Sequence, residues 1–125
     1  MATMVWKDEY SVGNDLLDEQ HKQLIETVNE LKGGAALGEV LAALRHYGDV
    51  HFRTEEGMLE ASDYPDLERH RGYHEAFRTW LEDTEEKHRS GSESAESRRD
   101  IYNYLCVWLA NHFLVYDKAF ETWLK

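Results

Sequence analysis

The chain has only one cysteine, Cys106, and only one proline, Pro65, among its 125 residues. A single cysteine cannot form an internal disulfide, which agrees with a reducing compartment, so we expect a cytoplasmic protein. The first ten residues are mixed and charged, and no secretory signal is expected there. No apolar run approaches the roughly 18–20 residues that cross a bilayer, so we expect no membrane-spanning segment.

Positive charge is scarce as well. The 14 Lys and Arg residues face 25 Asp and Glu residues, which gives a formal net charge of −11. Because such a surface repels phosphate backbones and anionic lipids, we expect neither nucleic acid nor a membrane as a partner. Whether a protein partner or an oligomer exists is left open. Apolar residues make up 42% of the chain, which is long enough to bury a core, and we expect a single domain over residues 1–125.

Apolar side chains recur at helical spacing in four stretches. These stretches cover about residues 15–32, 37–61, 66–89 and 94–124. The glycines Gly33 and Gly34 end the first stretch, and Pro65 is placed to open the third. Residues 1–14 lack a helical period and form an arm that we expect to pack along the helices. Four helices of similar length with short connections predict an all-α, antiparallel up-and-down four-helix bundle.

Each of the four stretches carries ionisable side chains within its apolar stripe. They are His21, His51, Glu55, His70, His74, His112 and Asp117. In the second stretch His51 and Glu55 are four residues apart, and the same stripe includes Tyr47 and Met58. Burying a neutral polar group without a partner costs about 1–3 kcal/mol, and a charge costs more. A domain with about 5–15 kcal/mol of net stability cannot carry seven such groups, so the pattern predicts a metal cluster.

The ordinary alternative is that these residues are hydrogen-bonded core groups. A lone pair of histidines four residues apart is more often an accident of a helix than a metal site. Four helices that each contribute ligands at matching depth make that alternative improbable. His46 and His88 lie off the inner faces or at a helix end, and we expect them to be ordinary residues.

The donor set narrows the choice of metal. Seven ligands are too many for one tetrahedral zinc, and five imidazoles are too rich in nitrogen for calcium or magnesium. Imidazole with carboxylate suits iron, copper, nickel or zinc, and a pair of octahedral ions with bridging carboxylates indicates iron. If Glu55, Asp117 and one oxygen bridge two irons, five histidines divide three and two. One iron then keeps an open position for a small ligand.

At these residues the chain resembles the hemerythrin family in its single-domain bacterial form. The resemblance covers nearly the whole chain, and it rests on four motifs. They are Asp18-Glu19-Gln20-His21, His51-Phe52-Arg53-Thr54-Glu55, His70-x-x-x-His74 and His112-x-x-x-x-Asp117.

The resemblance implies two iron ions, Fe2+ or Fe3+, bridged by Glu55, Asp117 and an oxo or hydroxo group. It assigns His70, His74 and His112 to the saturated iron and His21 and His51 to the open one. O2 would bind at the open iron as a hydroperoxide. The walls of the O2 pocket would be Leu24, Phe52, Trp108, Leu109 and Phe113.

Two features of the predicted site need a structural explanation. His112 and Asp117 are five residues apart, which in a regular α-helix turns them about 140° from each other. Either Asp117 reaches sideways or the helix has a π-type bulge there. The ligand imidazoles also need acceptors for their outer N–H groups, and Asp18 and Asp66 are candidates.

The leading functional hypothesis is reversible O2 binding for storage, delivery or sensing, by a protein that is not an enzyme. One alternative is a di-iron oxidase or peroxidase that uses the same open position. Another is a regulatory module that responds to O2, NO or iron.

Overall fold

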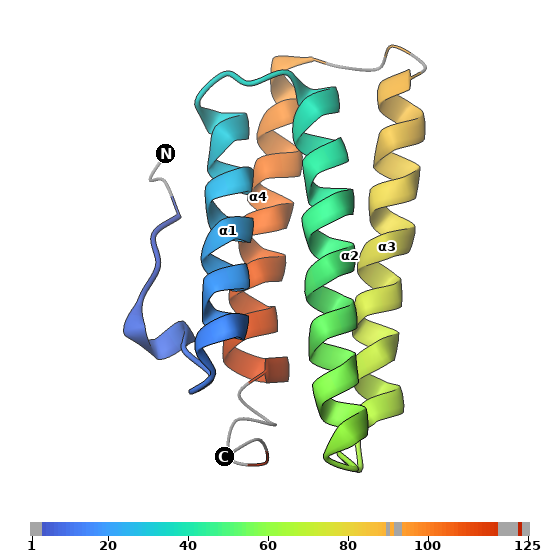
Figure 1. Ribbon diagram of the computed structural model, residues 1–125. Coiled ribbons are helices and arrows are strands. Elements are labelled where there is room, and N and C mark those ends of the chain that lie inside the picture. The colour runs from blue at the N-terminus through green and yellow to red at the C-terminus, as the bar shows by residue number, and fades with distance from the viewer. Residues whose placement is uncertain (1–3, 90, 92–93, 118–122, 124–125) are drawn as a thin grey trace.

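The computed structural model describes residues 4–89, 91, 94–117 and 123. Its elements are η1 (Asp8–Tyr10), α1 (Asp15–Lys32), α2 (Leu37–Ala61), α3 (Leu67–Arg89), α4 (Ala95–Asn111) and η2 (His112–Asp117). The four long helices alternate in direction (Figure 1), with α1 packed against α2 and α4, and α2 against α3. The described residues contain no strand. The predicted all-α four-helix bundle is therefore confirmed. No helix among these residues is long and apolar enough to cross a membrane.

Local chemistry sets the helix ends. The Asn14 side chain accepts a hydrogen bond from the Leu17 amide at 3.1 Å and caps the start of α1. That helix ends at the predicted pair of glycines, where Gly34 adopts a φ of +94° that favours glycine. A reciprocal pair of bonds between Ser94 and Ser97 caps α4. The bounds of α1 and α2 agree with the sequence-based ranges, and α3 begins one residue later than expected.

The C-terminal segment differs from the expectation. The fourth helix is α-helical only to Asn111 and continues as the π-helical segment η2. The expected continuation to residue 124 lies largely outside the described residues. Tyr47, which we expected on the inner face of α2, is instead 39% exposed. Gly48 takes the buried position of that turn and faces the Phe77 ring.

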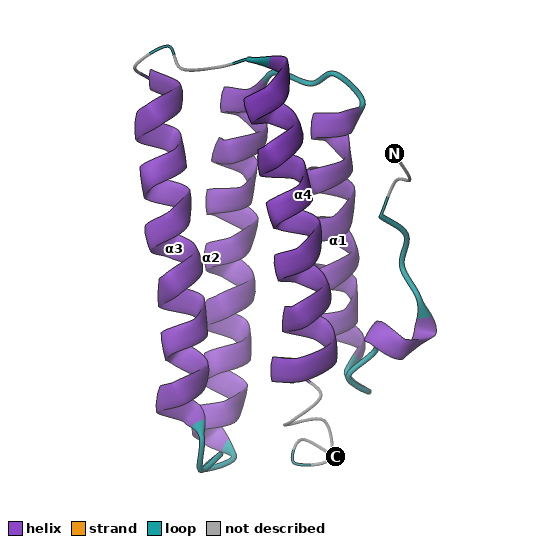
Figure 2. Cartoon of the chain, turned by 180° about the vertical axis from the view of Figure 1, so that it is seen from behind, coloured by secondary structure: helices purple, strands orange, loops and turns teal. Residues whose placement is uncertain are grey.

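The N-terminal arm lies along the bundle, beside α1 and α4 (Figure 2). Its Tyr10 and Val12 side chains are buried. The Met4 amide donates to the Tyr102 hydroxyl at 3.1 Å, and the Asn29 side chain donates to the Met4 carbonyl at 2.7 Å. These bonds fix the arm across one flank of the bundle and cover the core there.

The core has two halves of opposite character. The apolar half, toward the α1–α2 and α3–α4 connections, is built from Val28, Leu31, Leu37, Val40, Leu41, Leu44, Leu81 and Leu105. The polar half, toward the α2–α3 turn, contains His21, His51, Glu55, His70, His74, His112 and Asp117, none more than 2% exposed. Packing of the apolar half thus positions the same four helices that carry the buried ionisable groups.

Candidate metal centre

All seven side chains predicted as ligands meet in the polar half. Their donor atoms form two groups in which every atom lies within 4.8 Å of the others. One group is His21, His51, Glu55, His112 and Asp117, and the other is Glu55, His70 and His74. Glu55 belongs to both groups. The remaining histidines lie elsewhere: His46 is exposed, and His88 lies in the last turn of α3, at the opposite end of the bundle.

Each carboxylate presents its two oxygens to different histidines. Glu55 Oε2 lies 3.1 Å from His51 Nε2, whereas Oε1 contacts the His70 ring and lies 3.0 Å from His74 Nε2. Asp117 Oδ2 lies 2.9 Å from His112 Nε2, and Oδ1 lies 3.3 Å from His70 Nε2. Both carboxylates therefore stand between the two sets of imidazoles, which is the arrangement that a bridging ligand needs.

The π-helical segment η2 explains the spacing of the two predicted ligands that it carries. A π turn joins residue i to residue i+5, so it brings residues five apart onto the same side of the helix. His112 and Asp117 are the first and last residues of η2, and their donor atoms are 2.9 Å apart. Of the two explanations offered by the sequence, the π-type bulge is therefore the one found.

The donor atoms are close together but poorly hydrogen-bonded. Nε2 of His51 lies 3.0 Å from Nε2 of His21 and 3.3 Å from Nε2 of His112. Glu55 Oε2 and both Asp117 oxygens are buried and make no aligned hydrogen bond despite these near nitrogens. Buried polar atoms in native proteins are normally satisfied. Converging lone pairs of imidazole and carboxylate fit metal cations, and this donor set fits iron.

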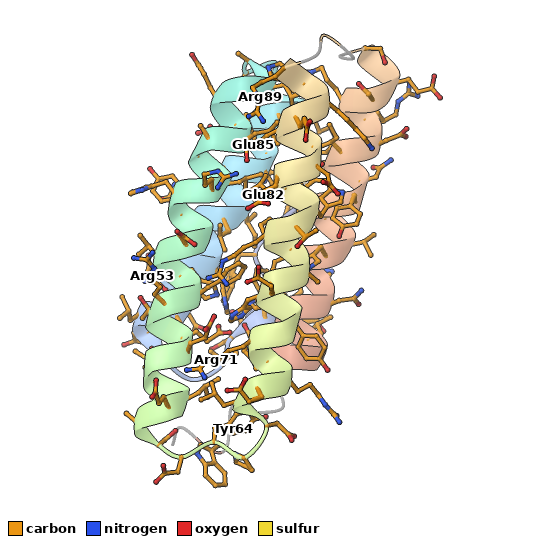
Figure 3. All side chains as sticks on the ribbon, turned by 90° about the vertical axis from the view of Figure 1, so that its right-hand side faces the viewer. Arg53, Tyr64, Arg71, Glu82, Glu85 and Arg89 are labelled. Carbon is orange, nitrogen blue, oxygen red and sulfur yellow. The ribbon has the colours of Figure 1, made fainter. Side chains whose placement is uncertain are left out.

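Two acceptors outside the cluster orient its imidazoles. Nδ1 of His51 donates to Gln20 Oε1 at 2.9 Å, and Nδ1 of His74 donates to Glu56 Oε2 at 2.7 Å. A proton held on Nδ1 leaves the Nε2 lone pair free to face the cluster. Arg71, at the seam of α2 and α3 (Figure 3), contacts Glu56 at 3.3 Å and holds it in place.

Gln20 and Glu56 were not among the residues that the sequence predicted at the site. Each is the sequence neighbour of a ligand, and a neighbour on a helix is turned by about 100° toward the adjacent helix. This adjacency in the sequence is the signal from which Gln20 and Glu56 could have been predicted. The prediction for Asp18 is wrong, because its carboxylate accepts from Ser11 Oγ and the Val12 amide and so anchors the arm. For Asp66 the role of the carboxylate stays a prediction.

The charges of the cluster shift its pKa values in opposite directions. Burial lowers the pKa of His51 to about 4. Burial acts the same way on His70 and His112, but the carboxylates of Asp117 and Glu55 outweigh it and raise these pKa values to about 9 and about 10. The histidines in turn hold the pKa values of both carboxyl groups below their usual range, against the effect of burial. The pKa of His21 is raised as well, through its contacts with Asp117 and Glu55 and against the effect of burial. Without metal, the raised pKa values favour protonated imidazoles beside the two carboxylates.

Three of the five residues predicted to wall an O2 pocket lie directly beside imidazoles of the cluster. The Phe52 ring stacks on His74 with centroids 4.0 Å apart, Trp108 stacks on His112 at 4.8 Å, and Phe113 lies 4.4 Å from His21. Leu24 and Leu109 are buried in the same core cluster. These side chains make the surroundings of the cluster apolar.

Comparison with known proteins places the chain in a family. The Hemerythrin HHE cation binding domain matches residues 12–124. The bacteriohemerythrin of Stenotrophomonas maltophilia is 31% identical over 131 residues, which cover 100% of this chain and 84% of that protein. The bacteriohemerythrin of Methylococcus capsulatus is 31% identical over 132 residues, which cover 100% and 99%. A crystal structure of wild-type hemerythrin superposes with a TM-score of 0.88 at 28% identity, covering 98% of each chain.

The chain belongs to the hemerythrin family. This confirms the resemblance inferred from the four motifs, and non-haem iron is the metal that the family implies. The hemerythrin homologues that it matches are oxygen-binding proteins rather than enzymes, in agreement with the expectation for this chain.

Proposed function

We propose that the chain binds O2 reversibly at a non-haem di-iron centre formed by the seven buried side chains. The observation that carries this proposal is the position of Glu55 and Asp117, each with one oxygen toward either set of imidazoles. The iron pair, when bound, supplies the two electrons that reversible O2 binding requires. We assign Glu55 and Asp117 as the bridging ligands, together with an oxo or hydroxo group.

The five imidazoles would hold the irons unequally. Family motifs assign His70, His74 and His112 to the saturated iron, and His21 and His51 to the iron with an open position. The interatomic distances instead group His112 with His21 and His51. We keep the motif-based division as the proposal, because Asp117 Oδ2 reaches both His21 and His112 and the distances therefore do not separate them.

The apolar walls would determine how long bound O2 persists. Leu24, Phe52, Leu109 and Phe113 are at most 3% exposed, and Trp108 is half-buried. Side chains packed this closely exclude water and the protons it carries. Because a proton promotes the loss of bound oxygen as peroxide, an environment without water favours reversible binding over irreversible oxidation. The walls thus serve as core packing and as a barrier to solvent.

Metal analysis combined with optical spectroscopy tests the proposal. We expect two irons per chain and an oxygenated spectrum that disappears on anaerobic reduction and returns on exposure to air. One zinc per chain, or no metal, would contradict the proposal. Steady consumption of O2 with an added reductant would instead indicate an oxidase.

A further inference from the structure

A row of aromatic rings leads from the metal centre to the surface between α3 and α4. It begins at Trp108, which stacks on the ligand His112 with centroids 4.8 Å apart and planes 12° apart. The Phe77 ring lies 4.3 Å from Trp108, and Trp80 lies 5.9 Å from Phe77. We call Trp108, Phe77, Trp80 and Tyr104 the ring row. Each member is in contact range of the next, so the four rings form a continuous path of π systems.

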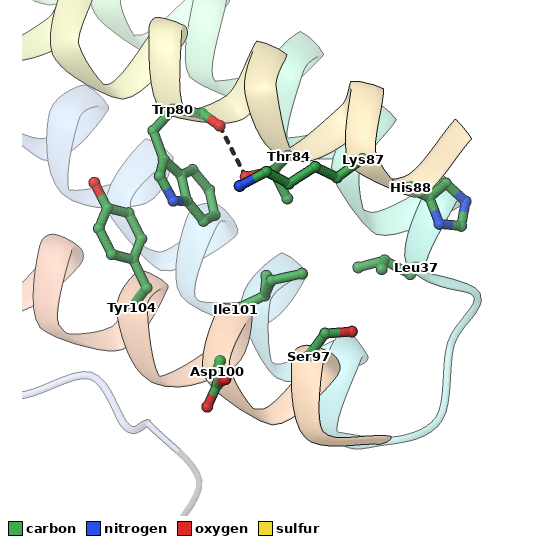
Figure 4. Close-up of a pocket in the computed structure, with 9 residues that line it drawn as sticks. All are labelled: Leu37, Trp80, Thr84, Lys87, His88, Ser97, Asp100, Ile101 and Tyr104. Atoms are coloured by element: carbon green, nitrogen blue, oxygen red, sulfur yellow. Dashed lines mark hydrogen bonds between the residues drawn. The ribbon is translucent and has the colours of Figure 1, made fainter. Parts of the chain in front are cut away.

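The outer end of the ring row is open to solvent. Tyr104 stacks on Trp80 with centroids 4.2 Å apart and planes 17° apart, and it is 40% exposed. Figure 4 shows both rings side by side at the wall of a cavity of about 250 Å³. Small reductants can therefore approach the pair, and water can take the phenolic proton.

The order of residues along the row suits transfer of oxidising equivalents. Indole and phenol are the aromatic side chains that lose an electron most readily, whereas the phenyl ring of Phe77 can only mediate a step. Electron transfer slows steeply with distance, so rings in contact exchange electrons faster than separated ones. An indole lies next to the ligand and a phenol lies at the surface, where loss of its proton makes its oxidation favourable.

We propose that the ring row transfers oxidising equivalents from an over-oxidised metal centre to the surface and so protects the buried ligands from oxidation. This inference rests on the proposed di-iron function. Trp108 gives one electron to the centre, Trp80 replaces it across Phe77, and Tyr104 replaces the electron of Trp80. Tyr104 releases its phenolic proton to water and becomes a neutral radical. A thiol or ascorbate from solution then donates a hydrogen atom, so one electron in total moves from the reductant to the centre.

A second set of rings near the centre lacks these features. Phe113 lies 4.4 Å from the His21 ring, and behind it are Trp6 at 6.2 Å and Tyr10 at 5.2 Å. The ring beside the ligand is therefore a phenylalanine, and Tyr10 is only 6% exposed. We expect the ring row, rather than this set, to carry the oxidation.

Freeze-quench electron paramagnetic resonance tests the inference on the iron-loaded protein. Hydrogen peroxide would over-oxidise the centre, and we expect a tyrosyl radical that is lost in Tyr104→Phe. It should also be lost in Trp80→Phe. The matched control is Tyr47→Phe, because Tyr47 is 39% exposed but lies on α2 outside the row. A radical that persists in Tyr104→Phe, no tyrosyl radical at all, or a radical on Tyr10 would overturn the inference.

A second measurement does not depend on iron. Pulse radiolysis with azide radicals oxidises tryptophan in the purified protein to a tryptophan radical. Absorbance then follows the decay of this radical as a tyrosyl radical forms. Trp6 and Trp123 also lie 5.8 Å from a tyrosine, Tyr10 and Tyr64 respectively, so part of the signal does not come from the ring row. We expect a first-order phase, independent of protein concentration, whose amplitude falls in Tyr104→Phe and is unchanged in Tyr47→Phe. Equal amplitudes in the two variants would contradict the ring row. Reversible O2 binding is measured on each variant, so failure of the di-iron proposal is distinguished from failure of the ring row alone.

Discussion

The two halves of the bundle use the same four helices and the same periodicity, yet they bury opposite chemistry. In the apolar half two buried hydroxyl groups are satisfied within their own helices. Thr27 Oγ1 donates to the Gln23 carbonyl, and Thr84 Oγ1 to the Trp80 carbonyl, both at 2.8 Å. In the polar half Glu55 Oε2 and both Asp117 oxygens find no aligned hydrogen bond. The apolar half is therefore stabilised by burial of its side chains, whereas the stability of the polar half depends on a bound metal.

Removal of metal should have the largest effect and should separate the halves. A ligand at a thousand times its Kd stabilises the folded state by about 4 kcal/mol, and a buried di-metal centre should exceed that. We expect the stripped protein to lose amide protection around His51, His74 and His112. Amides around Leu41 and Leu105 should stay protected. Hydrogen exchange with mass spectrometry, on loaded and stripped protein, would contradict the comparison if protection fell equally at both ends.

Two single substitutions, one in each half, should affect different properties, namely stability in the apolar half and metal content in the polar half. Leu44→Ala removes a buried side chain from the apolar half and should lower the free energy of unfolding by about 2–5 kcal/mol, with metal content unchanged. Glu55→Gln removes the charge of a proposed bridging ligand, and we expect this variant to bind fewer than two irons per chain. Urea unfolding and elemental analysis measure the two effects. Loss of iron in Leu44→Ala, or full iron content in Glu55→Gln, would break the distinction.

The acceptor outside the cluster should matter less than the ligands themselves. Glu56→Ala leaves Nδ1 of His74 without its acceptor, and loss of such a partner typically lowers metal affinity by about 10–100-fold. Glu60→Ala is the matched control, because Glu60 also contacts Arg71 but does not touch a ligand. Competition with a chelator measures both affinities. Equal affinities in the two variants would show that Glu56 does not orient His74.

The apolar walls should control the lifetime of the oxygenated form. Leu109→Ala opens space beside the centre, and we expect autoxidation to accelerate by about tenfold, which corresponds to ~1.4 kcal/mol in the barrier. Leu105→Ala is the control, since Leu105 lies one turn away on α4 and is equally buried in the apolar half. The decay of the oxygenated spectrum reports both rates. An unchanged lifetime in Leu109→Ala would remove this residue from the pocket.

The smallest expected signal is a release of protons. The raised pKa values of His70 and His112, about 9 and about 10, mean that both rings are protonated in the metal-free protein near neutral pH. Metal ligation needs neutral imidazole, so loading should release at least these two protons at about pH 7.5.

The same shifts have a consequence for stability without metal. Because the folded-state pKa values lie above the unfolded value of about 6.5, their stabilisation is complete below that pH. It is lost as the pH rises through about 9 to 10. Titration in a weakly buffered solution counts the protons released on metal loading, and loading without release would contradict protonated imidazoles in the metal-free polar half.

The fold and most of the site followed from periodicity and residue type. Leu17, Leu24 and Val28 mark the inner face of α1, and the helical period alone places His21 on that face and in the core. The spacing of His112 and Asp117 also indicated an irregular helix, although it left two geometries open. Such features depend on residues close in sequence, whose relative directions a helix fixes.

What could not be predicted depends on contacts between helices. The bond from His51 to Gln20 joins α2 to α1, and that from His74 to Glu56 joins α3 to α2. Neither follows from the period of one helix, because it depends on how two helices are rotated against each other. The exposure of Tyr47 was not predicted for the same reason, since the rotation of α2 against α3 turns Gly48, rather than Tyr47, toward the Phe77 ring.

Anomalous diffraction at the iron absorption edge, from crystals of the loaded protein, tests the central claim most directly. We predict two iron peaks, both within bonding distance of Glu55 and Asp117, with the five histidines divided between them. The same map would show which of the two irons His112 binds. A single peak, a metal bound by the histidines without the two carboxylates, or zinc in place of iron would contradict the di-iron centre.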